Sequence, residues 1–130
     1  MPDTGHRVER DAFARHVGIE LMEVRAGFAK ARLRLGPQHL NGVGVVQGGV
    51  IFSLADLAFA AACNQDAPVT VAINASICFM KAVREGVLHA QAEEVTSNLR
   101  LGAYSVRVTD DAGQTVATFQ GLAYRRKADS

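Results

Sequence analysis

Asp56 is the residue whose surroundings in the sequence most strongly indicate chemistry. It lies within an apolar run, Gly48 to Asn64, with Phe52 four residues before it and Ala60 four residues after it. On a helix these neighbours share its face, so the carboxylate would lie among apolar side chains, where an unpaired charge is costly. Such a group usually serves in an ion pair, a metal site or catalysis. The structural alternatives are a hydrogen bond that organises the core or an ion pair with Arg32, Lys81 or Arg100.

Two adjacent glycines, Gly48 and Gly49, stand where a helix over this run would begin. The first backbone N–H groups of a helix have no intrahelical partner, and the helix dipole is positive at that end. Acyl transfer needs donors of this kind to stabilise an oxyanion, each worth ~3 kcal/mol, and glycine lets a substrate carbonyl approach the backbone closely. A tight turn into the helix would explain the two glycines without any chemistry.

The spacing between the glycines and the carboxylate has a consequence for assembly. Gly48 and Asp56 are eight residues apart, which corresponds to ~12 Å along one helix. Reacting groups must approach within ~3 to 3.5 Å, so one carbonyl cannot contact both residues of the same chain. If both act on one thioester, they come from different chains, and the enzyme is at least a dimer with two equivalent sites.

The elements that would position these residues are one central helix and an antiparallel sheet, which makes the fold class α+β. Because the run Gly48 to Asn64 is apolar almost all the way round, we expect other elements to enclose that helix. Residues 1–17 are expected to form a tail and a short helix, and residues 1–130 a single domain. Alternating patterns and turn residues predict strands over 18–24, 28–35, 69–80, 87–95, 101–109 and 115–124, with the strand at 69–80 strongly apolar on one face.

Composition limits the partners and the location. Apolar residues make up 48% of the chain and the net charge is +1 with scattered basic residues, so neither nucleic acid nor a membrane surface is an expected partner. Cys63 and Cys78 are interpreted as buried free thiols of a reducing compartment, and residues 1–10 lack the apolar segment of a signal peptide, so a cytoplasmic location is expected. No metal site is expected, because the spacing of three isolated histidines does not suit one: His6, His16 and His89.

The motifs follow one another in a familiar order. They are Asn41-Gly42, Gln47-Gly48-Gly49, Phe52 to Asp56, Ala62-Cys63-Asn64, Phe79-Met80-Lys81, Gly86, Gly102-Ala103-Tyr104, Thr115-Val116-Ala117 and Phe119. This order resembles the phenylacetic acid degradation (PaaI-like) branch of the hotdog-fold thioesterases. The resemblance implies a curved antiparallel sheet wrapped around a long helix, dimers that join two sheets into one, often a homotetramer, and an acyl-coenzyme A site at the dimer interface.

The resemblance also implies roles for individual residues. The amide of Gly48, with that of Gly49, would polarise the thioester carbonyl, Asp56 of the partner subunit would attack it or activate water, and Asn41 would position the water or the substrate. Coenzyme A is part of the substrate, and no separate cofactor is implied. The expected acyl groups are aryl or medium-chain groups. The remaining expected contacts are Phe52, Phe59 and Met80 for the acyl group, Asn74 and Ser76 for its orientation, and Lys81, Arg84 and Arg100 for the phosphates of coenzyme A.

Gln47 departs from the family pattern, which usually has histidine at this position. Glutamine can donate a hydrogen bond but cannot carry a proton, so a mechanism that needs this histidine as an acid or base is excluded, whereas one based on Gly48 and Asp56 survives. Two alternatives remain open. One is a non-catalytic acyl-coenzyme A binding protein in which Asp56 is structural. The other is a hotdog hydratase or dehydratase, for which His39 is the nearby substitute histidine.

Overall fold

The structure is a computed structural model, which describes residues 10–64 and 70–126. The helices are α2 (Ala12–Val17) and α3 (Gly48–Cys63), with a 3-10 turn, η2 (Pro37–His39), between them. The strands are β1 (Glu20–Arg25), β2 (Phe28–Arg34), β3 (Thr70–Phe79), β4 (Val87–Ser97), β5 (Leu101–Thr109) and β6 (Thr115–Arg125). The predicted elements are thus present with small differences at their ends. Two predicted parts lie outside the described residues: the tail at residues 1–9 and Val69, the first residue of the predicted strand over 69–80.

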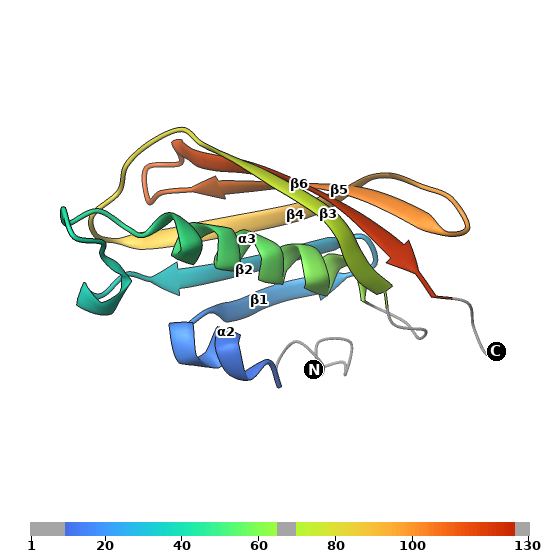
Figure 1. Cartoon of the computed structure of the whole chain (residues 1–130), viewed down its shortest axis with the longest axis horizontal. Coiled ribbons are helices and arrows are strands. Elements are labelled where there is room, and N and C mark those ends of the chain that lie inside the picture. The colour runs from blue at the N-terminus through green and yellow to red at the C-terminus, as the bar shows by residue number, and fades with distance from the viewer. Residues whose placement is uncertain (1–9, 65–69, 127–130) are drawn as a thin grey trace.

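The six strands form one antiparallel sheet in the order β1-β2-β4-β5-β6-β3. The sheet curves around α3, and α2 lies beside α3 near β1 (Figure 1). Short hairpin turns join β1 to β2 and β5 to β6, and each contains a glycine with positive φ, Gly27 at 72° and Gly113 at 80°, a conformation that other residues rarely adopt. The α+β class predicted from the sequence is confirmed.

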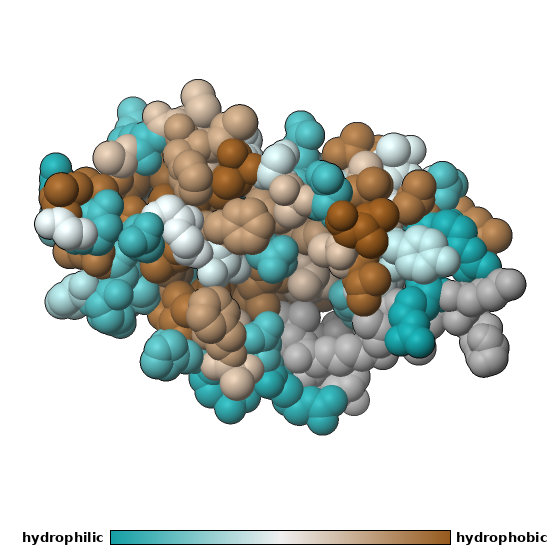
Figure 2. Space-filling model, viewed as in Figure 1, coloured by the Kyte–Doolittle hydropathy of each residue, from teal (hydrophilic) through white to brown (hydrophobic). Residues whose placement is uncertain are grey.

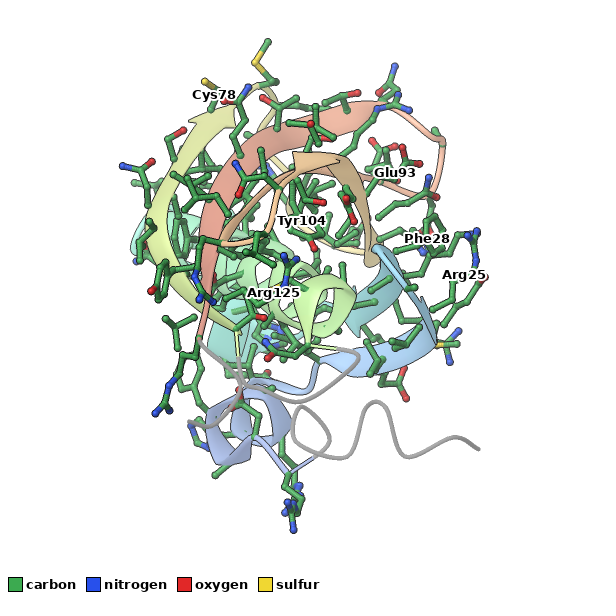
Figure 3. The ribbon with its side chains drawn as sticks, turned by 90° about the vertical axis from the view of Figure 1, so that its right-hand side faces the viewer. Arg25, Phe28, Cys78, Glu93, Tyr104 and Arg125 are labelled. Carbon is green, nitrogen blue, oxygen red and sulfur yellow. The ribbon has the colours of Figure 1, made fainter. Side chains whose placement is uncertain are left out.

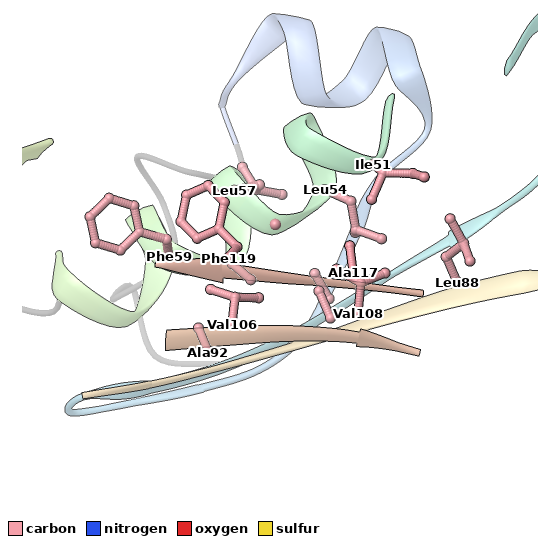
Figure 4. Packing of buried hydrophobic residues seen from close by; sticks show 14 of the residues in the cluster. Ile51, Leu54, Leu57, Phe59, Leu88, Ala92, Val106, Val108, Ala117 and Phe119 are labelled. Atoms are coloured by element: carbon pink, nitrogen blue, oxygen red, sulfur yellow. The ribbon is translucent and has the colours of Figure 1, made fainter. Parts of the chain in front are cut away.

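The core lies between the concave face of the sheet and one side of α3 (Figure 4). Leu54 of α3 and Leu88 of β4 are fully buried, and the ring of Phe59 packs against Tyr104 and Phe119. A side chain at Gly121 would come within 2.7 Å of the Phe59 ring, so only glycine fits there. Among the described residues, neither helix combines the length and the apolar character needed to cross a bilayer.

One side of α3 is not covered by the described residues, which corrects the prediction that the helix is enclosed on all sides. The residues on this side are wholly or partly exposed and recur at helical spacing: Gly49, Phe52, Ser53, Asp56 and Ala60. We call these five residues the open stripe of α3. The sheet curves around the other sides of the helix only, so residues 10–64 and 70–126 of one chain leave this stripe uncovered, although the helix is apolar almost all round.

β3 is an edge strand, and nearly all of it is exposed. The pairing of β3 with β6 is irregular between Ala72 and Asn74, which places one extra residue, Ile73, in the strand. An extra residue reverses the alternation of side chains. The single apolar face predicted for residues 69–80 is therefore wrong: Ile77 and Phe79 lie on the helix side of the sheet, opposite Phe119 and Ala117, whereas Val71 lies beyond the irregularity and is 42% exposed.

The two cysteines differ in environment. Cys63, in the last turn of α3, is partly buried, whereas Cys78 is exposed on the outer side of β3 (Figure 3). The prediction of two buried thiols is therefore wrong for Cys78. The reason is its register: Cys78 pairs with Thr118, whose side chain also points away from the helix, between the buried residues Ala117 and Phe119.

Candidate active site

The loop that leads into α3 is held by the side chain of Asn41. Its Oδ1 accepts hydrogen bonds from the N–H groups of Val43 (2.9 Å) and Val45 (3.2 Å), while its own N–H donates to the carbonyl of Val45 at 2.7 Å. This arrangement is a local turn built by an asparagine side chain. The Nδ2 group has no partner among the described residues and remains available as a donor. Asn41 therefore builds the loop with one end of its amide and can meet a substrate or water with the other.

The first amides of α3 are unsatisfied. The carbonyl of Gln47 accepts from the N–H groups of Val50 (2.9 Å) and Ile51 (3.3 Å), which is the normal start of a helix. The N–H groups of Gly48 and Gly49 have no acceptor within the described parts of the chain, and the exposed side chain of Gln47 does not cap them. Two donors at the positive end of the helix dipole are thus free to bind a carbonyl oxygen or an anion.

The two glycines have different surroundings. A Cβ atom on Gly48 would lie 3.2 Å from the ring of Phe79, so packing alone explains why this residue is small. A Cβ atom on Gly49 would meet nothing closer than the Gln47 side chain at 4.0 Å, and no positive φ requires glycine there. The space in front of Gly49 is open, as it must be if a substrate approaches these amides.

Asp56 lies on the open stripe, half-buried and without an ion pair. The cations proposed from the sequence do not reach it: Arg32 pairs with Glu20 at 2.7 Å, and Lys81 pairs with Asp110. No salt bridge joins Asp56 to any described residue. Burial raises the pKa of Asp56 above its ordinary value, and the negative charge of Asp11, the N-cap residue of α2, raises this pKa further. A carboxylate in this position holds a proton more tightly than an exposed one.

Gly48 and Asp56 are on one continuous helix, so the separation of ~12 Å inferred from the sequence applies. Their functional groups cannot meet at one carbonyl within a single chain. The structure thus places two free amide donors at the start of α3 and a half-buried carboxylate further along the same helix.

The three basic residues predicted to bind phosphate are not brought together in one chain. Lys81 contacts Asp110 and Gln114, and it holds the pKa of the Asp110 carboxyl below its ordinary value. Arg84 donates to the carbonyls of Gly44 (3.1 Å) and Val43 (3.5 Å) in the loop before α3, with no carboxylate beside it among the described residues. Arg100 lies in the turn between β4 and β5. Of the three side chains, Arg84 is the one that contacts the loop leading into α3.

The predicted acyl contacts are also divided. Phe52 lies on the open stripe, with its ring 5.3 Å from that of Phe119, and Met80 is 65% exposed at the end of β3. Phe59 is 1% exposed and belongs to the core. Asn74 and Ser76 lie on the outer face of the sheet, opposite Leu122 and Gln120 and away from α3 of the same chain.

Two residues near the site were not among the predicted site residues. Phe79, on β3, has its ring against Gly48. The sequence feature that could have indicated this contact is its place at the end of an alternating apolar pattern. His39 is 3% exposed and lies under the loop, where its carbonyl accepts from the N–H of Gln47 at 2.9 Å. A lone histidine in the sequence gave no indication of this contact.

Within the described residues, no group of three or more His, Cys, Asp or Glu side chains is placed to hold a metal ion.

Comparison with known proteins gives consistent similarities. Residues 43–117 match the sequence profile of the thioesterase superfamily. Over 118 residues the chain is 36% identical to the acyl-coenzyme A thioesterase PaaI of Escherichia coli, covering 90% of this chain and 84% of that protein. The structure of the E. coli PaaI protein from the phenylacetic acid degradation operon superposes with a TM-score of 0.91 at 33% identity, covering 96% of this chain and 92% of that one. The phenylacetic acid degradation protein PaaI of Thermus thermophilus gives 0.85 at 30% identity, covering 89% and 100%.

Proposed function

The chain belongs to the thioesterase superfamily and has its hotdog fold, and from this premise we propose that it hydrolyses acyl-coenzyme A thioesters to the free acid and coenzyme A. The observation that carries the proposal is helix α3, which combines two unsatisfied amides at its start with a half-buried carboxylate on its open stripe that has no ion pair among the described residues. Acyl transfer requires these two components, a donor for the developing oxyanion and a base or nucleophile.

The proposed chemistry uses the residues in complementary roles. The N–H groups of Gly48 and Gly49 bind the thioester oxygen, which gains negative charge as the carbonyl carbon is attacked. In one route Asp56 takes a proton from water, the hydroxide forms a bond to the carbonyl carbon, and the C–S bond then breaks. The thiolate of coenzyme A leaves with the proton held by Asp56. In the other route the Asp56 carboxylate forms a bond to the carbonyl carbon, the C–S bond breaks, and coenzyme A leaves as the thiolate. Water then hydrolyses the resulting anhydride, which releases the free acid, regenerates the Asp56 carboxylate and supplies the proton that the thiolate takes up.

The proposed site is shared between two copies of the chain. Supporting this, β3 is a free edge of the sheet and carries exposed apolar residues, among them Ile73 (54%) and Phe79 (52%). Hydrophobic side chains gather on the face that carries α3 and β3 (Figure 2). A second copy added at β3 would continue the sheet and cover the open stripe, whose small residues let two helices approach closely. Gly48 of one chain could then meet Asp56 of the partner subunit.

The proposed substrate class extends what is known of the relatives. The E. coli relative is an acyl-coenzyme A thioesterase, and the solved E. coli protein comes from a phenylacetic acid degradation operon. We extend this to aryl or medium-chain acyl groups here, with Phe52 and Met80 as apolar contacts and Arg84 as a contact for the coenzyme A phosphates. A cytoplasmic location and a role in phenylacetate degradation are parts of the same proposal.

His39 argues against a hydratase or dehydratase. Both of its ring nitrogens are occupied, and it is almost completely buried, so it cannot exchange protons with a substrate. The second candidate function is therefore the non-catalytic acyl-coenzyme A binding protein. The observation that favours it is Gln47, whose exposed side chain neither caps the helix nor supplies a proton.

The test of the reaction is thiol release from a panel of aryl and aliphatic acyl-coenzyme A thioesters. We expect turnover by the wild type and a loss of at least about 100-fold in Asp56→Asn, since that change removes the base or nucleophile. Glu85→Gln, the same kind of change at an exposed position, is the matched control and should leave turnover unchanged. Binding of the panel without thiol release by the wild type would support the binding protein instead, and Gln47→His would be the next variant.

The shared site can be tested by mixing two inactive variants. Gly48→Pro keeps a residue suited to the first position of a helix but removes the N–H, and Asp56→Asn removes the carboxylate. Co-refolding equal amounts should restore about a quarter of wild-type turnover, because half of the dimers are mixed and each has one intact site. No recovery, with mixed dimers demonstrated by mass spectrometry, would contradict a site that combines Gly48 of one chain with Asp56 of the partner subunit.

A further inference from the structure

His39 is a buried polar residue whose hydrogen bonds are fully determined. Its Nδ1 accepts from the N–H of Gly36 at 2.9 Å, and its Nε2 lies 2.7 Å from the carbonyl oxygen of Val17. An N–H group only donates and a carbonyl only accepts, so the imidazole must be neutral with its proton on Nε2. Because the ring is buried, loss of either partner would leave a polar group without a hydrogen bond and away from water, which is unfavourable.

The backbone of the same residue contacts the start of the catalytic helix. The carbonyl of His39 accepts from the N–H of Gln47 at 2.9 Å, and Gln47 directly precedes Gly48. Next to this contact, an isolated bridge pairs Leu40 with Val46. One residue therefore links the C-terminal end of α2, through Val17, to the first turn of α3, through Gln47.

Helix α2 depends on this link for its position. It has six residues, which is far too short for a helix to be stable alone, and Ala14 is its only buried residue. It packs against α3 (Figures 1 and 4), and its N-cap residue, Asp11, is close enough to act electrostatically on Asp56. The bond from His39 to Val17 fixes the end of α2 that lies opposite this cap.

We propose that His39 is a positioning residue, which holds helix α2 and the first turn of α3 in one arrangement so that the Gly48 and Gly49 amides are correctly placed for catalysis. This inference rests on the proposed thioesterase function for its catalytic part. The coupling between α2 and the start of α3 is a property of the folded chain and can be measured without a substrate.

Two substitutions separate the contacts of the ring. In His39→Gln the side-chain NH2 can reach the position of Nε2 and keep the bond to Val17. In His39→Asn the side-chain oxygen can take the position of Nδ1 and accept from Gly36, but the side chain is too short to reach Val17. The proposal expects His39→Gln to resemble the wild type and His39→Asn to lose the link to α2.

Hydrogen exchange and kinetics give the two readouts. In His39→Asn we expect amide exchange to rise about 10-fold or more in both α2 and residues 47–51, with little change in β4 to β6. We expect kcat for thiol release to fall about 10-fold or more with KM within about 3-fold, because misplaced amides weaken transition-state binding. His39→Gln should restore both readouts.

Each outcome decides between explanations. Wild-type exchange and kcat in His39→Asn would overturn the inference. So would a rise in exchange throughout the sheet with equal losses in both variants, since His39 would then be an ordinary core residue. A wild type that releases no thiol would refute the proposed function, and the exchange of α2 and residues 47–51 would still decide whether His39 couples them.

Discussion

The protonation of Asp56 is governed by its immediate neighbours, and one of them can be neutralised without disturbing the fold. Asp11 raises the pKa of Asp56 through its negative charge, and it also caps α2 by accepting from the N–H of Ala14 at 3.0 Å. Asparagine caps a helix as well as aspartate does, so Asp11→Asn removes the charge and keeps the cap. We expect the pKa of Asp56 to fall, which moves the acid limb of the kcat/KM profile for thiol release to lower pH.

The matched variant for this prediction is Asp11→Ala, which removes the charge and the cap together. It should shift the acid limb in the same direction and also lower stability by about 1 kcal/mol, the usual value of an N-cap. Thermal unfolding separates the two effects. An acid limb that stays in place in Asp11→Asn would show that burial alone sets the protonation of Asp56.

Substitution by alanine is expected to have different effects on stability at the two adjacent glycines. Gly48→Ala must displace the Phe79 ring, so we expect a loss of stability of about 1 kcal/mol or more. Gly49→Ala meets no close atom and adds a better helix former, so stability should stay level or rise by up to about 1 kcal/mol. Its methyl group nevertheless fills the space in front of the amides, so thiol release should fall. Full turnover by Gly49→Ala would mean that the substrate does not approach this amide.

At the residue scale, the sequence predicted features that follow from the spacing of residues, and it missed features that depend on which atoms a side chain contacts. The placement of Asp56 among apolar neighbours followed from helical spacing. The ion pair of Lys81 with Asp110 joins residues that are far apart in the sequence, and no spacing rule gives it. The turn that Asn41 builds with the N–H groups of Val43 and Val45 is local, but the sequence does not show which end of the amide it uses. The open space at Gly49 likewise became visible only when the neighbours of each glycine were known.

At the scale of elements, two titratable groups, Cys63 and Tyr104, are packed between the C-terminal end of α3 and the sheet. Burial raises the pKa of Tyr104 on β5 from its ordinary value of 10.0 to about 12, and that of Cys63 in α3 from 9.0 to about 11. Arg125 of β6 lies beside Tyr104 at this end of the molecule (Figure 3). Both groups are therefore held in their neutral forms by the packing of α3 against the sheet.

This packing predicts a loss of stability at alkaline pH. Because both groups ionise more readily in the unfolded chain, their contribution is complete below about pH 9 and is lost as pH rises through the folded-state values. We expect the melting temperature to fall steadily between pH 9 and 12, and Tyr104→Phe to reduce the part of that fall above pH 10. Differential scanning calorimetry across this range is the measurement. An equally steep fall in Tyr104→Phe would show that Tyr104 does not contribute.

The elements themselves were largely predictable, and the exceptions have physical causes. Alternation and turn residues located every strand, because half-buried antiparallel strands repeat every two residues. The irregularity of β3 between Ala72 and Asn74 could not be predicted, since an alternating sequence carries no sign of the residue at which the pairing shifts. The open stripe of α3 was missed for another reason: a helix apolar on all sides does not reveal whether its cover comes from its own chain.

At the scale of the whole molecule, the outer face of the sheet is divided by charge. Over β1, β2 and β4 it carries ionisable side chains such as Lys30, Arg32, His89 and Glu93, with Arg107 beside them on β5. Over β3, β6 and the adjoining part of β5 the outward side chains are uncharged: Asn74, Ser76, Cys78, Thr118, Gln120, Leu122, Ala103 and Ser105. We call this second region the uncharged zone. Interface cores are depleted of charge, so the zone suits contact with another copy.

The uncharged zone gives the predicted tetramer a specific geometry. If two chains join at β3, their zones become continuous across the dimer, because β3 is the border of each. Two such dimers could then pack through their outer sheet faces, which leaves α3 and the active sites on the outside. The wild type should accordingly sediment as a tetramer, and the contact between dimers should be sensitive to charge in the uncharged zone.

Gln120→Lys tests this geometry with a close control. The new ammonium group would be buried at the proposed contact near its symmetry copies, where unpaired like charges cost several kcal/mol, enough to separate the dimers. Gln91→Lys makes the same change on the same face but among the charged side chains, so it should leave the assembly intact. Sedimentation velocity should show dimers for Gln120→Lys and tetramers for Gln91→Lys, with thiol release retained by both because each active site needs only one dimer. Tetramers of Gln120→Lys would place the contact elsewhere, and a dimeric wild type would contradict the tetramer itself.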